Sequence, residues 1–203
     1  MFYTLQGEGI QAGRPAIFCR FSGCNLWSGL ERDRPEAKCR FCDTDFTGVN
    51  GENGGKFAAP ADVVKAAVKF WPEVPSKKFI VLTGGEPLLQ VNTALISELH
   101  ASNFEIAIET NGTILCPAEI DWICVSPKAG TEIVQTTGNE LKVVYPQPGL
   151  NLSKLVTLSF EHFLIQPMDG PNLEANIDAS IEFCKENPIW RLSVQTHKNV
   201  GIR

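Results

Sequence analysis

Buried apolar strands that alternate with helices predict an α/β fold built on a parallel sheet, in which both faces of each strand are covered. The chain has 203 residues, whereas a complete eight-fold barrel typically needs about 250. The later connections, 111–121 and 127–140, contain prolines and glycines and are too irregular for full-length helices. The sequence therefore predicts an incomplete parallel (β/α) TIM-like barrel with about six strands and three main helices.

The predicted strands are short runs rich in β-branched and aromatic residues. The first, AIFCRFS at 16–22, places alternate side chains on opposite faces. The later strands are expected at 78–83, 104–110, 122–126, 141–145, 162–166 and 190–195. Apolar residues at helical spacing predict the main helices at 60–71, 91–102 and 173–187. Asn92 is a candidate N-cap for the second of these helices.

The segment 23–56 holds glycines, charges and three cysteines, and shows little periodicity. A loop of this length inside a compact domain is usually functional or disordered. We find no domain linker, internal repeat or low-complexity segment. The sequence therefore predicts one domain over 1–203, in which 23–56 is a ligand-binding loop that a metal centre would fold around itself.

Charge and composition narrow the class of partner. The net charge of -5 and the lack of a long basic run argue against nucleic-acid binding. No apolar stretch is long enough to span a bilayer and no leader is recognised, so we expect no membrane partner and a soluble, cytoplasmic protein. Seven cysteines in such a chain favour a metal or redox role over disulfides. Because strand-like sequence begins almost at Met1, we hypothesise that the native N-terminus lies a few residues upstream.

Three cysteines, Cys24, Cys39 and Cys42, are spaced C-x14-C-x2-C. The last two lie a turn apart, so both can reach one metal centre. Most electron-transfer iron–sulfur clusters use four cysteines. Three thiolates around an iron–sulfur cube would leave one iron without a protein ligand, and a small molecule could coordinate and react there.

Four short motifs follow predicted strands at their carboxyl ends, where parallel α/β folds place their chemistry. They are TGGEP at 83–87, ETNG at 109–112, SPK at 126–128 and QPMDGP at 166–171.

The motif residues suggest the chemistry of one ligand. Gly84 and Gly85 remove side chains where the backbone must approach a ligand. Glu86 could hold an ammonium group, Glu109 could accept two ribose hydroxyls, and Lys128 could pair with a carboxylate. S-adenosylmethionine carries all of these groups, and its radical chemistry is a known cofactor class.

The chain resembles the radical S-adenosylmethionine enzymes in three features: the cysteine triad, Phe41 just before Cys42, and the TGGEP motif. The long cysteine spacing replaces the usual C-x3-C-x2-C. Together with FYTLQGEG, FCRFSGCNLW, CDTDF, ETNG, SPK, NELKVV and THK, it makes nearly the whole chain similar to the 7-carboxy-7-deazaguanine synthase family. The chain departs from that family in its very short N-terminus. The resemblance implies a single radical S-adenosylmethionine domain over 1–203, with 23–56 as the cluster-binding loop.

The resemblance also implies the reaction. A 4Fe-4S cluster on the three cysteines gives one electron to S-adenosylmethionine, and a 5'-deoxyadenosyl radical takes a hydrogen from 6-carboxy-5,6,7,8-tetrahydropterin. The ring contracts to 7-carboxy-7-deazaguanine with loss of ammonia, in queuosine and 7-deazapurine biosynthesis. The cofactor is re-formed and not consumed. Family members use Mg2+ bound to substrate and to a threonine that matches Thr44, a hard oxygen ligand. An electron donor such as flavodoxin and a homodimer are expected partners.

The pterin has a guanidine-like edge and a carboxylate. Gln6 and Glu8 can read donors on that edge, and Arg20 can grip the carboxylate. On the strand 16–22, Arg20 shares a face with Phe18, which we expect to point inward because a buried arginine on the helix side would lack a partner. The other expected contacts are Phe41, Ser126 and Gln166 to the cofactor, and Thr83, His197 and the terminal carboxylate of Arg203 to the substrate.

Alternatives remain at this stage. Cys19 could complete a four-cysteine zinc site in a non-catalytic zinc or iron–sulfur binding module, although core packing is the simpler role for it. A glycyl-radical-enzyme activating enzyme would share the triad but act on a protein. TGGEP could be only a tight turn, Glu109 and Lys128 could be surface charges, and Arg20 could stack on a phenylalanine. Cys116, Cys124 and Cys184 are expected to be buried thiols in apolar surroundings.

Overall fold

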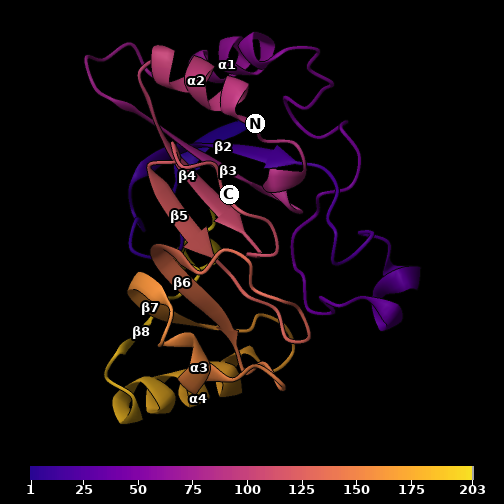
Figure 1. The fold of residues 1–203 in the computed structure, drawn as a ribbon, viewed down its shortest axis with the longest axis vertical. Coiled ribbons are helices and arrows are strands. Elements are labelled where there is room, and N and C mark those ends of the chain that lie inside the picture. The colour runs from indigo at the N-terminus through magenta and orange to yellow at the C-terminus, as the bar shows by residue number, and fades with distance from the viewer. Residues whose placement is uncertain (203) are drawn as a thin grey trace.

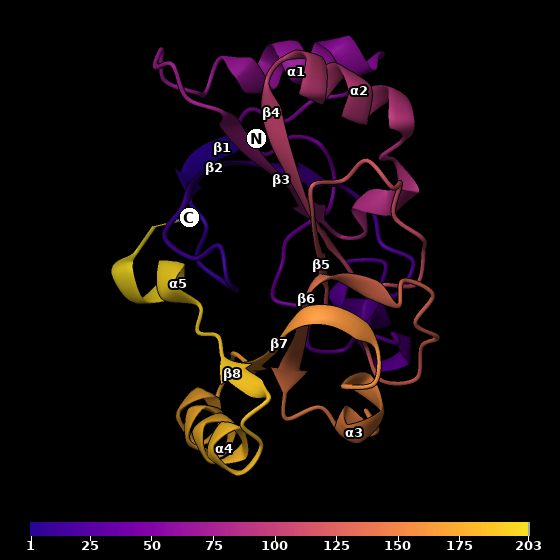
Figure 2. The ribbon, with the colours of Figure 1, turned by 60° about the vertical axis from the view of Figure 1, so that its left-hand side comes forward.

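The computed structural model describes residues 1–202. Its centre is one sheet of eight strands in the order β1 to β8. β1 runs antiparallel to β2, and every later pair of neighbours is parallel. Within the described residues β1 and β8 do not pair with each other, so the barrel stays open between them (Figure 2). The strands are β1 (Phe2–Leu5), β2 (Pro15–Phe21), β3 (Lys78–Gly84), β4 (Phe104–Thr110), β5 (Trp122–Val125), β6 (Thr137–Tyr145), β7 (Ser159–Pro167) and β8 (Trp190–Leu192).

The predicted incomplete α/β barrel is confirmed, but the sheet has eight strands rather than about six. β1 was not among the predicted strands, although its sequence is strand-like, because the run has only four residues and its antiparallel partner β2 is not indicated locally. A strand this short depends on its neighbour for stability.

The three main helices are confirmed as α1 (Pro60–Val68), α2 (Thr93–Ala101) and α4 (Leu173–Glu186). Asn92 caps α2 as expected, since its side chain accepts a hydrogen bond from the Leu95 amide. Among the described residues there is no helix with both the length and the hydrophobicity of a transmembrane span. The shorter elements are η1 (Glu31–Glu36), η2 (Pro87–Leu89), α3 (Leu152–Leu155) and α5 (Thr196–Val200).

Two apolar layers hold the helices on the outside of the sheet. α1 and α2 cover β2, β3 and β4 through a core that includes Ile17, Ile80 and Leu99 (Figure 1). α4 covers β7 and β8 at the other end of the sheet, over a second core that includes Phe163 and Trp190.

The inner face of the sheet changes character along the strands. At the amino ends a small cluster of Ala16, Phe79, Val81 and Ala107 fills the barrel. Because side chains on one face recur every second residue, the inward positions that follow this cluster and Phe18 toward the carboxyl ends belong to polar side chains. They are Arg20 on β2, Thr83 on β3 and Glu109 on β4. The apolar cluster closes one end of the barrel and leaves the other end for a polar site.

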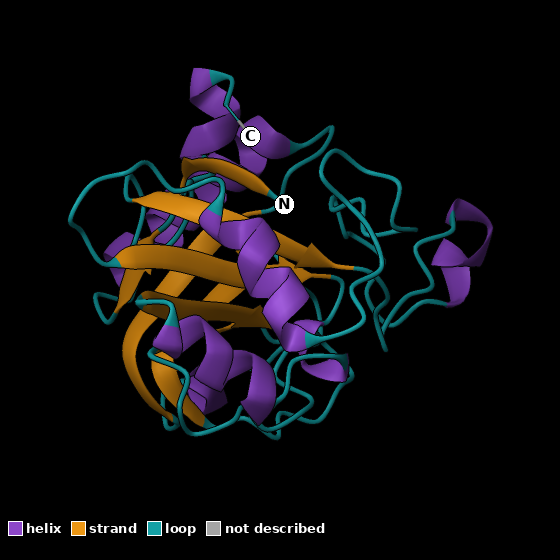
Figure 3. Cartoon of the chain, turned by 90° about the horizontal axis from the view of Figure 1, so that it is seen from above, coloured by secondary structure: helices purple, strands orange, loops and turns teal. Residues whose placement is uncertain are grey.

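The segment 23–56 forms the long loop at the carboxyl ends of the strands, and η1 projects from it well away from the sheet (Figures 1 and 3). It has its own small core, in which the ring centroids of Trp27 and Phe46 lie 5.5 Å apart. The Arg34 guanidinium lies 4.0 Å from the Trp27 ring and donates a hydrogen bond to the Cys42 carbonyl. The loop is therefore folded against itself near its cysteines.

Candidate active site

A cavity of about 280 Å³ opens at the carboxyl ends of the strands. The long loop, the turns that follow the strands, and the two ends of the chain all contribute to its wall. Almost all the predicted site residues meet here, although their positions span most of the sequence. They are Gln6, Glu8, Arg20, Cys24, Cys39, Phe41, Cys42, Thr44, Thr83, Gly84, Gly85, Glu109, Ser126, Lys128, Gln166 and His197. Arg203 lies outside the described residues.

The three predicted cluster ligands, Cys24, Cys39 and Cys42, all line this cavity. Cys39 and Cys42 share a hydrogen bond, which lowers the pKa of Cys42 to about 6 and raises the pKa of Cys39. Within residues 1–202 no three His, Cys, Asp or Glu side chains converge closely enough to hold a single metal ion. The ligands of a cubane attach to three different irons, so they need to surround a volume rather than converge. Three soft sulfur donors around one cavity fit an iron–sulfur cluster.

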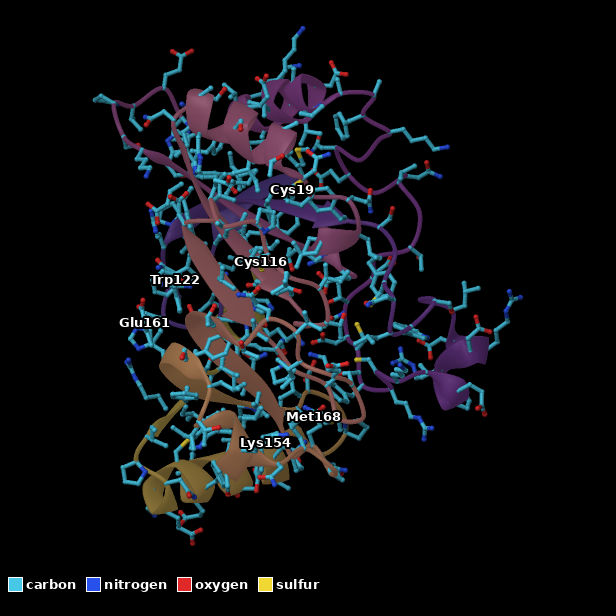
Figure 4. All side chains as sticks on the ribbon, viewed as in Figure 1. Cys19, Cys116, Trp122, Lys154, Glu161 and Met168 are labelled. Carbon is cyan, nitrogen blue, oxygen red and sulfur yellow. The ribbon has the colours of Figure 1, made fainter. Side chains whose placement is uncertain are left out.

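Cys19 does not join the other cysteines. It lies on β2 beneath α1 and α2 (Figure 4), packed in the same core as Ile17 and Leu82. Burial raises the pKa of its thiol to about 12. Its neighbour Arg20 lines the cavity on the opposite face of the strand. The four-cysteine zinc site is therefore not formed, and Cys19 has the packing role that its strand position favours.

The glycines of TGGEP border the cavity, but the close approach that requires them is made by the chain itself. A Cβ on Gly84 would lie 2.2 Å from the Phe21 carbonyl oxygen, and one on Gly85 would lie 2.1 Å from the Gly23 carbonyl oxygen. The Gly85 amide donates a hydrogen bond to the Phe21 carbonyl (3.1 Å). The motif therefore packs the end of β3 against the backbone that leads into Cys24.

Glu86 requires a correction, because its carboxylate does not face the cavity. The residue is fully buried. One carboxylate oxygen accepts hydrogen bonds from the Leu88 amide (3.1 Å) and the Thr110 hydroxyl (2.9 Å), and the other accepts one from the Asn111 amide (2.8 Å). Because the Glu86 carboxylate has no exposed surface and does not line the cavity, a ligand ammonium in the cavity does not reach it in this structure. Glu86 instead joins the turn after β3 to the turn after β4.

The ETNG turn reaches from β4 to the start of the long loop. The Asn111 side chain donates to Asn25 Oδ1 (2.9 Å), and the Asn25 side chain donates to the Thr113 hydroxyl (2.8 Å). Sequence reasoning noticed the motif but missed this connection, because nothing local indicates that Asn25 is its partner. These bonds fix the residue next to Cys24.

Lys128 lies beside the cluster cysteines. Its ammonium donates to the backbone carbonyl (2.6 Å) and hydroxyl (2.8 Å) of Ser126, and it lies 5.8 Å from the centre of the Phe41 ring. Burial lowers its pKa, while the negative charge of thiolates at Cys39 and Cys42 opposes that shift. The described part of the chain gives Lys128 no carboxylate within ion-pair distance.

Glu109 is grouped with residues that were expected to bind the substrate rather than the cofactor. One carboxylate oxygen accepts a hydrogen bond from the Gln6 side chain (3.0 Å), and the other accepts one from the Thr83 hydroxyl (3.0 Å). Gln6 also accepts a hydrogen bond from the Glu8 amide (3.1 Å). These bonds join β3, β4 and the loop after β1 into one polar wall.

Glu8 forms a buried ion pair with Lys142, a residue of the NELKVV motif to which sequence reasoning gave no role. Burial by itself would raise the pKa of Glu8, but the attraction of Lys142 and its hydrogen bond lower it to about 2. The second carboxylate oxygen accepts a hydrogen bond from the Gln195 side chain (2.9 Å). Glu8 is therefore ionised and held from two sides.

The two ends of the chain meet over the cavity. α5 lies beside the N-terminal loop (Figure 2), where the Thr196 amide donates to the Gly7 carbonyl (2.9 Å). A Cβ on Gly7 would lie 2.2 Å from His197 Nδ1, so only glycine fits there. This contact brings His197 to the cavity wall, as expected from its position after the last strand.

Lys198 on the same helix connects two rim loops. Its ammonium pairs with Asp43 (2.6 Å) in the long loop and with Asp169 (2.5 Å) after β7. Each of these residues belongs to a motif noted in the sequence, namely CDTDF, QPMDGP or THK. The local sequence does not show that the three residues pair. The three residues are called the C-terminal clasp below.

Cys124 corrects another expectation. It is buried, but it lies in the cavity wall near Lys142, Glu109 and Glu140 rather than in apolar surroundings. Burial raises its pKa, which leaves a neutral thiol between the charged groups. Cys116 and Cys184 are partly buried and pack against the two outer cores, as expected.

Comparison with known proteins defines the class first. Residues 35–142 match the Radical SAM superfamily, and the chain belongs to it. Membership implies a 4Fe-4S cluster and S-adenosylmethionine, for which the three cavity cysteines are suitable ligands.

Relatives named 7-carboxy-7-deazaguanine synthase narrow the class. The chain is 56% identical to the one from Caulobacter vibrioides and 57% identical to the one from Burkholderia multivorans, in each case over 100% of this chain and 96% of the relative. The crystal structure of QueE from Escherichia coli superposes with a TM-score of 0.71 at 26% identity, covering 97% of this chain and 92% of that one. The chain is a member of the 7-carboxy-7-deazaguanine synthase family, radical S-adenosylmethionine enzymes of 7-deazapurine biosynthesis.

Proposed function

We propose that this enzyme converts 6-carboxy-5,6,7,8-tetrahydropterin to 7-carboxy-7-deazaguanine with loss of ammonia. One observation carries the proposal: a single cavity is lined both by the three thiols and by Gln6, Glu8, Glu109 and Arg20. Such a cavity can hold a cluster-bound cofactor and a small polar ring together. A protein substrate would not need polar side chains arranged to hydrogen-bond a small ring inside a cavity.

The thiol side of the cavity would hold the cofactor. A 4Fe-4S cluster with S-adenosylmethionine supplies a carbon radical that abstracts hydrogen from the substrate. Within residues 1–202 Lys128 has no carboxylate partner, and Ser126 holds its ammonium in place, so the ammonium can bind the carboxylate of the methionyl group. Phe41, Gly84 and Gly85 also line the cavity, and Gln166, which was predicted as a cofactor contact, lies near Glu8.

The opposite side would read the pterin. Glu8 is a carboxylate and can accept hydrogen bonds from ring N–H groups. Gln6 and Thr83 orient Glu109, so we assign Glu109 to the substrate end rather than to the ribose. Arg20 lies on the inward face of β2, where its guanidinium donates to the Asp45 carbonyl (3.5 Å) and leaves most of its donors for a substrate carboxylate. His197 closes this end from α5.

We further propose Mg2+ at Thr44, which follows Cys42 on the cavity wall. The threonine hydroxyl is a hard oxygen ligand, and Mg2+ usually takes only one or two protein ligands and fills its remaining positions with water and substrate oxygens. A flavodoxin-like electron donor and a homodimer complete the proposal, and family membership alone supports them.

Anaerobic turnover tests the function. Purified enzyme, reconstituted with iron and sulfide, is incubated with reductant, S-adenosylmethionine, Mg2+ and the carboxypterin, and the product is followed by mass spectrometry. We expect 7-carboxy-7-deazaguanine, with no product when the reductant is omitted. A tetrahydropterin that lacks the 6-carboxylate is the matched substrate control. Formation of 5'-deoxyadenosine at the same rate with and without the carboxypterin, and no deazaguanine, would refute the proposal.

A further inference from the structure

An ammonium group lies in the wall of the cavity near its polar end. Lys142 is in the middle of β6 and is 5% exposed, while its neighbours Leu141 and Val143 on the opposite face belong to the outer core. A buried charge is costly unless it is paired and hydrogen-bonded. Its partner is the Glu8 carboxylate, with which it forms a short salt bridge.

Glu8 is held in one orientation by groups from several parts of the chain. Lys142 binds one carboxylate oxygen and the Gln195 side chain binds the other. Its backbone amide donates to Gln6, and the Gln166 side chain also hydrogen-bonds to its carboxylate. A carboxylate has about four lone-pair sites, so these partners leave room for a ligand N–H. Glu8 still faces the cavity, with 17% of its side chain exposed.

We propose that Lys142 is a positioning residue for the pterin: it keeps Glu8 as a fixed carboxylate that accepts hydrogen bonds from the guanidine-like edge of the substrate. This inference rests on the function proposed above. A neutral Glu8 would present a hydroxyl donor toward ring N–H donors, and substrate binding would weaken. Lys142 therefore acts on the substrate through Glu8.

The surroundings of Glu8 make its negative charge strongly dependent on Lys142. Glu109 on β4 and Glu140 on β6 add negative charge, and Cys124 on β5 is a neutral thiol. Without Lys142, burial and these like charges would all favour the protonated form of Glu8. The charge of Glu8 would then return only as the pH is raised, so substrate affinity would become dependent on pH.

Lys142→Met tests the inference, because methionine keeps an unbranched side chain only one heavy atom shorter and removes the charge. We expect KM for the carboxypterin to rise by at least about tenfold, the scale of a lost charge-assisted hydrogen bond. We also expect uncoupled 5'-deoxyadenosine formation without pterin to stay within about twofold of wild type, because the cofactor end is unchanged. KM of the variant should fall as pH rises from 6.5 to 9 more steeply than KM of the wild type over the same range.

Two further variants complete the test. Lys154→Met removes a solvent-exposed lysine of α3 and should change none of these quantities. Glu8→Gln and the double variant Glu8→Gln/Lys142→Met form a cycle in which the double variant should bind pterin no more weakly than Glu8→Gln. The double variant also avoids an unpaired buried charge, so the cycle remains informative if Lys142→Met folds poorly.

An unchanged KM in Lys142→Met, or losses that add in the double variant, would overturn the inference. In that case wild type would still make product, and the proposed function would stand. If wild type itself makes no deazaguanine, the proposed function fails first, and the positioning role of Lys142 fails with it.

Discussion

Gly85 offers the sharpest test of how the fold positions the cluster ligands. A Cβ at this position would lie 2.1 Å from the Gly23 carbonyl oxygen and 3.0 Å from the Cys24 Cβ. Ordinary contact begins near 3.4 Å, and the nearest atom is backbone that no rotamer change can move. Gly85→Ala must therefore separate the end of β3 from the segment that leads into Cys24.

The loss of stability in Gly85→Ala can be estimated as a range. Overpacking of this kind typically costs about 1–3 kcal/mol, which corresponds to a fall in Tm of roughly 2–12 °C for a chain of this size. Because the displaced segment carries Cys24, we expect iron incorporation and 5'-deoxyadenosine formation to fall more than the loss of stability alone would explain.

The assay compares iron per chain, the visible absorbance of reconstituted protein and Tm. Gly55→Ala is the matched control, because no described residue lies within 4 Å of a Cβ at that position and Gly55 lies in the same long loop as Cys24. Gly85→Ala protein with full iron content and wild-type uncoupled cleavage would refute the reasoning, since Cys24 would then not depend on this contact.

Other predictions concern the cavity rim. Arg20→Ala should raise KM for the carboxypterin and spare uncoupled cofactor cleavage; an unchanged KM would remove Arg20 from the substrate site. Lys198→Ala breaks both ion pairs of the C-terminal clasp, each partly exposed and worth about 0.2–1 kcal/mol. KM should therefore rise less than about thirtyfold and depend less on ionic strength than in the wild type; a salt response equal to wild type would contradict this role. Removal of Mg2+ with a chelator should lower turnover, and Thr44→Val should raise the Mg2+ concentration needed; full activity in chelator would exclude the metal from Thr44.

Alternation along a strand predicted part of the site correctly. The placement of Phe18 and Arg20 opposite Ile17 and Cys19 follows from the two-residue period of a strand, and the structure has Arg20 in the cavity wall and Cys19 in the outer core. The sequence near Met1 is also strand-like, but local alternation could not show that Phe2–Leu5 pairs antiparallel with β2.

Motif recognition located the rim, but the structure gives Glu86 a different place from the one expected. TGGEP and ETNG were interpreted as ligand contacts. The Glu86 carboxylate instead accepts hydrogen bonds from two backbone amides and one hydroxyl of the chain itself. The absence of a side chain at Gly85 makes room for the Gly23 carbonyl. A motif states which residues recur together. It does not state whether their partner is a ligand or another part of the backbone.

The sequence by itself determined the barrel, the cysteine trio and the identity of most of the groups around the cavity, because these depend on local periodicity, spacing and short motifs. The tertiary structure decided which of those groups face one another. Glu8 and Lys142 are 134 positions apart, and Lys198 and Asp43 are 155 positions apart. Such pairs form only when the sheet curls and brings the two ends of the chain together, and no local pattern encodes that meeting.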